Sequence, residues 1–300
     1  MLLGEMAALG AAICWAAAPI LYRQALFKVS PISANIVRCT SNAIFMVVVL
    51  FGFGWAGILA RLPMSALVLT VVSGIIGLVI GDTLYMYGLR SVGVSRAVPL
   101  AATYPLFSLL WVTFLLHQPV TVAAVVGASV IIVGIWLVSR EKGRNTFHVK
   151  GRIVLAGLVA SLLTAVIWSV SLSLMDVVVL MPGLGTVAAN YAVITVRIMS
   201  TALILLMLAP IIDGNHGFLK VSRKTILLLC IGGLVANAVG WLLMNYSFLN
   251  IAESQAVPIS STTPLFSVLA GYAMFHEKMT LNNTIGAAII VLGVVLVFLA

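Results

Sequence analysis

The sequence has few charged residues. Of its 300 residues only 8% are Asp, Glu, Lys or Arg, whereas 63% are hydrophobic. Because a soluble globular domain is about 25% charged and about 45–50% apolar, this composition excludes a soluble fold. Each membrane crossing needs about 20 mostly apolar residues, so the chain has room for roughly nine to eleven crossings. The composition therefore predicts an all-α polytopic membrane protein.

Acidic residues, cysteines and catalytic motifs are also scarce. Seven acidic residues stand against 16 Lys and Arg, a formal net charge of +9. Most of the cations lie in short gaps between apolar runs, which is typical of cytoplasmic loops, so we expect no nucleic-acid partner. The three cysteines lack CxxC spacing, the four histidines are scattered, and neither GxxxxGK[ST] nor HExxH occurs. We expect no metal, no cofactor and no enzymatic activity.

Ten apolar runs are separated by polar, Pro or Gly residues. They predict helices near 6–22, 31–53, 64–89, 97–116, 121–139, 152–174, 185–210, 224–249, 255–275 and 281–299. The longest polar stretch, residues 140–151, carries several Lys and Arg residues. It reads as a basic linker between a first unit, 1–139, and a second, 152–300.

An internal repeat relates these two units. Ala97-Val98-Pro99 recurs as Ala256-Val257-Pro258, and Pro105-Leu106-Phe107 recurs as Pro264-Leu265-Phe266, both after 159 residues. The same offset pairs Arg38 with Arg197, and Trp15 matches Trp168 after 153 residues. Because five helices are an odd number, the second copy must enter the membrane from the opposite side. We therefore predict two inverted five-helix repeats, the architecture of many secondary transporters.

The distribution of basic residues predicts the orientation of the chain. Thirteen Lys and Arg residues follow odd-numbered helices, and only Arg61 lies in an alternate loop. Since positive charge is enriched in cytoplasmic loops, this bias predicts a multi-pass protein of the plasma membrane with both termini outside.

These motifs resemble the drug/metabolite transporters, and within them the ten-helix members built from two EamA-type repeats. The resemblance covers nearly the whole chain. It rests on Trp15, Trp168, Pro31 with Arg38, Gly81-Asp82-Thr83-Leu84-Tyr85, the repeated proline segments and His276-Glu277-Lys278, where Gln118 replaces the usual Glu in the first half. It implies export of amino acids, uptake or exchange of sugars and other metabolites, or expulsion of toxic compounds. It also implies cytosolic termini, opposite to the charge bias.

Ionisable residues inside the bilayer are candidate functional residues because their burial is costly. Asp82 could bind a proton, and so couple transport to protons, bind a cationic group, or pair with Arg38. Arg38 and Arg197 occupy matching places and could hold a carboxylate or phosphate through two parallel hydrogen bonds. Alternatively, both arginines extend to the nearest interface.

The prolines indicate bends in the helices at 97–116 and 255–275. Freed carbonyls at membrane depth are tolerated where they line a wet cavity. We therefore expect these segments to line the pathway and to bend during gating, although the kinks could also only shape the bundle. The gating candidates are Pro99, Pro105, Pro258 and Pro264, and the lining candidates between them are Thr103, Tyr104 and Thr262.

Further cavity candidates lie on four other predicted helices. Asn237, Trp241 and Asn245 recur every four residues and form one helical stripe, with Tyr246 beside it. Tyr85 lies one turn from Asp82. Trp15 and Trp168 could stack on a substrate or anchor the helices at the interface.

The sequence as a whole predicts an alternating-access secondary transporter of a small metabolite, an exporter of amino acids or similar solutes. Three alternatives stay open: a flippase for lipid or polyprenyl head groups, a multidrug efflux protein, and a non-transporting assembly subunit. The expected partners are a small-molecule substrate and the lipid bilayer. The sequence leaves a monomer and a homodimer open.

Overall fold

The computed structural model describes residues 2–114, 120–139, 151–213, 216–266, 269 and 281–299, and this part of the chain contains helices and no strand. The first half forms α1 (Leu2–Leu26), α2 (Pro31–Gly52), α3 (Ala56–Leu59), α4 (Met64–Gly74), η1 (Ile75–Gly81), α5 (Asp82–Val92), α6 (Val94–Ala101), α7 (Tyr104–Phe114) and α8 (Val122–Ser139). The second forms α9 (Gly151–Val179), α10 (Val187–Ile212), η2 (Gly217–Lys220), α11 (Arg223–Gly233), η3 (Leu234–Gly240), α12 (Trp241–Phe248), α13 (Glu253–Ser260) and α15 (Leu281–Phe298). The all-α prediction is confirmed.

Seven helical segments in the described chain are long and apolar enough to cross a membrane. Shorter apolar helices lie at Val122–Leu137 and Thr284–Val297, and α13 begins the predicted ninth helix. A helix rises 1.5 Å per residue, so about 20 residues cross a hydrocarbon core of about 30 Å. The helices follow the ten predicted positions, and the chain is a polytopic membrane protein.

The third and eighth predicted helices each contain a π-helical segment. α4 and α5 are joined through η1, and α11 and α12 through η3, which begins 159 residues later. A π-helical turn takes one extra residue and often occurs at functional sites. Glycines at the ends of these segments admit tryptophans: a Cβ on Gly81 would lie 2.9 Å from Trp168, and one on Gly240 2.7 Å from Trp15.

The helix predicted at 97–116 is two helices, which corrects the prediction of one continuous kinked helix. α6 ends at Ala101 and α7 begins at Tyr104, since Pro105 has no N–H for a continuing helix and fits an early helical position. Thr103 donates its hydroxyl to the carbonyl of Leu100 at 2.7 Å. α13 is followed by a break 159 residues after the first, at 261–262.

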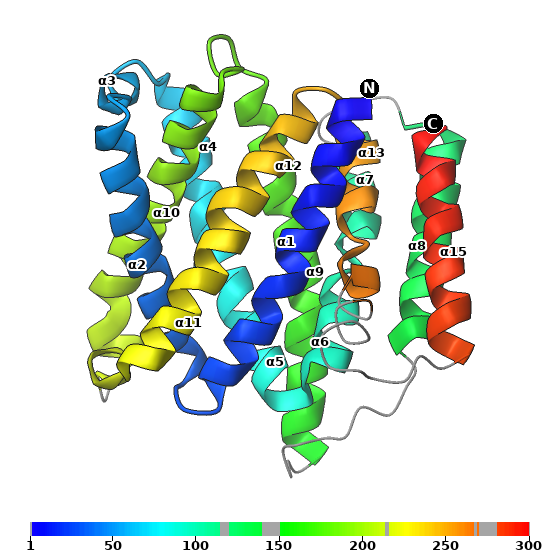
Figure 1. Cartoon of the computed structure of the whole chain (residues 1–300), viewed down its shortest axis with the longest axis horizontal. Coiled ribbons are helices and arrows are strands. Elements are labelled where there is room, and N and C mark those ends of the chain that lie inside the picture. Colours follow the sequence, from blue (N-terminus) through cyan, green and yellow to red (C-terminus); the bar gives the residue numbers. More distant parts are fainter. Residues whose placement is uncertain are drawn as a thin grey trace.

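The two halves run in opposite directions. In Figure 1 both termini lie on the same side of the molecule; α1 runs away from that side, and α9, its counterpart in the second half, runs toward it. The termini therefore share one face, as an even number of crossings requires. The predicted linker lies outside the described residues except for Gly151, and the His276-Glu277-Lys278 turn lies wholly outside them.

α8 and α15 pack against each other at one side of the bundle (Figure 1). Their contact depends on glycines: a Cβ on Gly127 would lie 2.9 Å from the carbonyl oxygen of Gly293, and one on Gly134 2.8 Å from that of Gly286. Small residues permit such close approach between membrane helices, where packing drives association.

Candidate functional site

A cavity of about 90 Å³ lies between the two halves. Since a water molecule takes about 30 Å³ in the liquid, the cavity has room for roughly three waters or a small solute. Sixteen of its 20 lining residues form eight pairs at equivalent repeat positions. These pairs are Trp15 and Trp168, Ala18 and Ser171, Pro19 and Leu172, Arg38 and Arg197, Gly77 and Ala236, Leu78 and Asn237, Asp82 and Trp241, and Tyr104 and Thr263.

The first half contributes a buried ion pair to the cavity wall. Arg38, on α2, and Asp82, at the start of α5, are 2% and 5% exposed, and a nitrogen of the guanidinium lies 2.5 Å from the carboxylate. The same nitrogen donates to the Asn35 side-chain oxygen at 2.7 Å. The indole N–H of Trp168 donates to the other Asp82 oxygen at 2.8 Å. Asp82 thus has partners at both oxygens, and Arg38 is paired inside the protein, not extended to an interface.

The second half presents an arginine without this partner. Position 241, equivalent to Asp82, is Trp241, and the guanidinium carbon of Arg197 lies 3.7 Å from the centre of its ring. Arg197 donates one hydrogen bond, to the Ser171 hydroxyl at 2.7 Å, and its Nε and its other terminal nitrogen have no partner. The residue is 1% exposed. Asp82 forms its ion pair with Arg38, and among the described residues no ion pair is found for Arg197.

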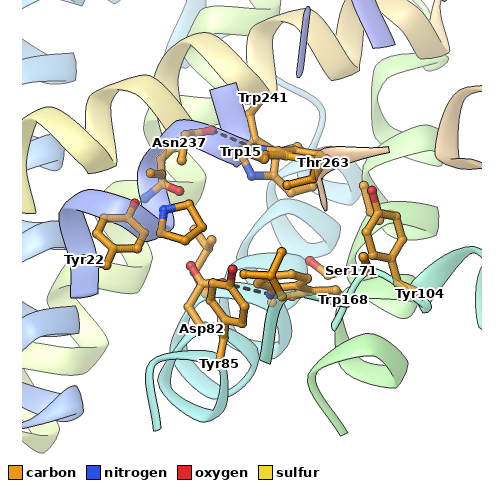
Figure 2. A pocket seen from close by; sticks show the side chains of 18 of the residues that line it. Trp15, Tyr22, Asp82, Tyr85, Tyr104, Trp168, Ser171, Asn237, Trp241 and Thr263 are labelled. Carbon is orange, nitrogen blue, oxygen red and sulfur yellow. Dashed lines mark hydrogen bonds between the residues drawn. The ribbon is translucent and has the colours of Figure 1, made fainter. Parts of the chain in front are cut away.

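Aromatic rings form much of the remaining wall (Figure 2). The indole of Trp15 donates to the carbonyl of Ala236 in η3 at 3.1 Å, and its ring centre lies 5.7 Å from that of Trp241. The Trp168 ring lies 4.8 Å from Tyr85 and 6.4 Å from Tyr104. The two aromatic groups in the cavity wall each combine residues of both halves.

Nine of the 13 predicted cavity residues line this cavity. They are Trp15, Arg38, Asp82, Tyr85, Tyr104, Trp168, Arg197, Asn237 and Trp241. The other four do not line it. Thr103 and Thr262 donate their hydroxyls to carbonyls of the preceding turn, Asn245 donates to Asn190 of α10 at 3.0 Å, and Tyr246 is 38% exposed. Of the predicted stripe, Asn237 and Trp241 therefore line the cavity. Asn245, one helical turn after Trp241, contacts α10 instead.

Three polar lining residues were not among the named candidates: Tyr22, Ser171 and Thr263, the last of which lies in the segment at 255–275 that was expected to line the pathway. The repeat contains the signal for two of them. Thr263 occupies the position equivalent to Tyr104, and Ser171 lies three residues after Trp168 on α9. Nothing in the sequence pattern distinguishes Tyr22, whose hydroxyl lies 3.5 Å from Arg38. The four candidate prolines flank the helix breaks without lining the cavity, and their gating role stays a prediction.

Comparison with known proteins identifies the family. The profile of the EamA-like transporter family matches residues 2–140 and 155–299, one match in each half. The chain belongs to this family. A relative described as an uncharacterized transporter, from Archaeoglobus fulgidus, is 26% identical over 297 residues, which cover 97% of this chain and 96% of that protein. A crystal structure of a protein with 18% identity shares the fold, with a TM-score of 0.75 over 99% of this chain and 96% of the other.

Among the described residues of this EamA-family protein, no group of three or more His, Cys, Asp or Glu side chains could hold a metal ion. The polar groups of the cavity are guanidinium, carboxylate, hydroxyl, amide and indole N–H groups. These groups bind and orient a solute through hydrogen bonds and charge. The cavity therefore has the chemistry of a binding site.

Proposed function

We propose that this EamA-family membrane transporter is a secondary transporter that carries a small metabolite with a carboxylate and an apolar group, such as an amino acid, by alternating access. The observation that carries the proposal is the buried, incompletely partnered guanidinium of Arg197. The aromatic walls and the repeat support the rest of the proposal.

Arg197 favours an anionic group in the cavity. A buried cation is costly unless a charge or several hydrogen bonds compensate for it, and inside a membrane protein such a residue is a functional candidate by default. Trp241 contributes only a cation–π contact, and Ser171 accepts one hydrogen bond. A carboxylate would supply an acceptor to Nε or to the unpartnered terminal nitrogen, and its second oxygen would accept from the remaining N–H of the nitrogen that donates to Ser171, which is the two-pronged geometry that arginine favours.

The cavity walls favour an apolar group on the same solute. Trp15, Trp168 and Tyr85 present ring faces and edges, and aromatic contacts contribute about 0.5–1.5 kcal/mol each beyond their buried area. The paired charges of Arg38 and Asp82 contribute no net charge. The net positive charge left by Arg197 disfavours cationic drugs, so the multidrug alternative is the weaker one.

The repeat supports alternating access. Eight pairs of equivalent residues surround the cavity, so exchanging the conformations of the two halves would open an equivalent site to the other face. The helix breaks at Ala102 and Ser261 occupy equivalent positions and provide places where such a movement could bend the chain. The charge bias supports termini outside the cell, and export is the direction that we propose.

The test uses purified full-length protein and matched ligands in a thermal-shift assay, because a ligand that binds the folded state raises its apparent stability. The panel pairs amino acids with their amides, which lack the carboxylate, and adds sugars, cationic drugs and glycerol phosphate. We expect amino acids to stabilise the protein and their amides to fail. Stabilisation by glycerol phosphate but not by carboxylates would favour the flippase alternative.

Two variants locate the bound anion. Arg197→Gln should weaken carboxylate binding about 10- to 150-fold, because a hydrogen bond to a charged group contributes about 1.5–3 kcal/mol. Arg90→Gln is the matched control, since Arg90 lies exposed near the end of α5. Equal affinity of both variants for the carboxylate ligand would refute the assignment of Arg197.

A further inference from the structure

A second polar site lies outside the cavity, centred on Glu253. This residue begins α13 and is 0% exposed. Its Oε1 accepts two hydrogen bonds, from the Ser108 hydroxyl of α7 at 2.5 Å and from the Ser173 hydroxyl of α9 at 2.6 Å. Its Oε2, also buried, has no hydrogen-bond partner. Glu253 therefore joins three helices through one oxygen and leaves the other unsatisfied.

A second carboxylate lies beside it. Asp176 is three residues after Ser173 on α9, hence on the same helical face, and is 1% exposed. The charges of Asp176 and Glu253 interact electrostatically. Two neighbouring buried carboxylates repel each other when both are ionised, which favours a bound proton. Burial of a carboxylate oxygen without a hydrogen-bond donor also favours the neutral acid, because the charged form has lost its solvation by water.

Other features favour the ionised form of Glu253. Both serine hydroxyls donate to it, and the first turn of a helix stabilises negative charge. Opposing influences of this kind keep both protonation states accessible, as reversible proton binding requires. Six described helices pack against α13, and four of them carry titratable side chains. These are Glu5, Cys14, Tyr22 and Arg23 of α1, Tyr104 of α7, Arg152 and Asp176 of α9, and Tyr246 of α12. The other two, α8 and α15, have none.

The location of Glu253 connects it to both halves of the protein. α7 belongs to the first repeat, whereas α9 and α13 belong to the second. One turn before Ser108, Tyr104 of α7 lines the cavity and its hydroxyl lies 2.8 Å from that of Ser260 on α13. On α9, Ser171 lines the cavity two residues before Ser173. The helices that hold Glu253 therefore also form the cavity wall.

We propose that Glu253 is a reversible proton-binding site, separate from the cavity, whose protonation state controls the contact between α7 of the first half and α13 of the second. When ionised, the carboxylate accepts the Ser108 hydroxyl and holds α7 against α13. When it takes up a proton, it loses its charge and this contact weakens. Asp82, the acid that the sequence suggested for proton binding, is paired with Arg38.

Infrared spectroscopy of the purified full-length protein tests whether Glu253 binds a proton. We expect a carboxylic-acid carbonyl band that shifts in heavy water, disappears as the pH rises and is missing in Glu253→Gln. Asp213→Asn is the matched control because Asp213 is also buried but accepts hydrogen bonds at both oxygens, from Ser33 and the Phe218 N–H. Retention of the full band in Glu253→Gln overturns the proposal.

If Glu253→Gln fails to fold, Ser108→Ala and Ser173→Ala keep the test decisive. Each removes one hydrogen bond that stabilises the carboxylate, so the acid band should persist to higher pH than in the wild type. An unchanged pH dependence in both variants overturns the proposal. Stabilisation of the wild type by sodium over choline, independent of pH, would also overturn it in favour of a sodium site.

A distance measurement tests the control of the α7–α13 contact. Spin labels at Phe114→Cys, at the end of α7, and Asn250→Cys, just before α13, are placed in a background lacking Cys14, Cys39 and Cys230. Both label positions are exposed. We expect the interspin distance distribution to change with pH, and to lose this change in Glu253→Gln. A distribution that is independent of pH in the Glu253 protein overturns the proposed control.

Discussion

Arg38 and Arg197 occupy equivalent positions in the two repeats, yet we expect opposite effects when each is replaced by glutamine. Arg38→Gln leaves the Asp82 carboxylate buried without its cation. Breaking a buried pair in this way costs about 3–5 kcal/mol. The Trp168 N–H that still bonds to Asp82 offsets only part of this loss.

Arg197→Gln removes a buried cation whose Nε and one terminal nitrogen have no partner. The variant loses the cation–π contact with Trp241, the hydrogen bond to Ser171 and the electrostatic attraction to Asp82. Removing the solvation penalty of the buried charge compensates for these losses. We therefore expect the ligand-free stability of Arg197→Gln to equal or exceed that of the wild type.

Thermal unfolding of both variants in the same lipid nanodiscs, without ligand, measures the difference. A loss of 3–5 kcal/mol lowers the melting temperature of a protein of this size by on the order of 10 °C. The double variant Arg38→Gln/Asp82→Asn should regain most of the loss, because it leaves no unpaired charge. An equal loss of stability in Arg38→Gln and Arg197→Gln would refute the reasoning from their different partners.

Three further predictions concern packing, the cavity and orientation. Gly134→Leu should destabilise the α8–α15 pair by about 1–3 kcal/mol in thermal unfolding, because even a Cβ would lie 2.8 Å from the Gly286 carbonyl oxygen, whereas Gly52→Leu, with nothing within 4 Å of its Cβ, should unfold like the wild type. Trp168→Phe should lower stability by about 1.5–3 kcal/mol by removing the hydrogen bond to Asp82, and an unchanged melting temperature would argue against that bond. In intact cells, a membrane-impermeant thiol reagent should label a cysteine added at the C-terminus of the protein. Protection of this cysteine from the reagent until the cells are lysed would show that the termini are cytosolic.

Glu253 was not among the functional candidates that the sequence suggested. Glu253 lies at the first position of a short helix, next to a loop, where a glutamate in a linear sequence reads as exposed to solvent. Its burial depends on Ser108 and Ser173, which are 145 and 80 residues away. Contacts over such separations leave no local pattern, so only the folded chain identifies them.

The helix breaks and the π-helical segments differ in how well the local sequence predicts them. The prolines predicted bends within two continuous helices, whereas the structure has breaks near both positions, 159 residues apart. The π-helical segments were not predicted, since their residues are as apolar as those of neighbouring turns. Their effect becomes visible only where Trp15 and Trp168 pack against Gly240 and Gly81.

The sequence by itself determined the helical membrane architecture, and it predicted about ten crossings in two inverted repeats. In a bilayer every backbone group must be satisfied within its segment, so apolar length alone predicts the crossings, and duplication preserves the pattern in the second half. The tertiary structure decided which polar side chains meet. It paired Arg38 with Asp82, placed Arg197 over Trp241 and turned Tyr246 outward, because such contacts depend on the rotation and packing of helices that are distant in the sequence.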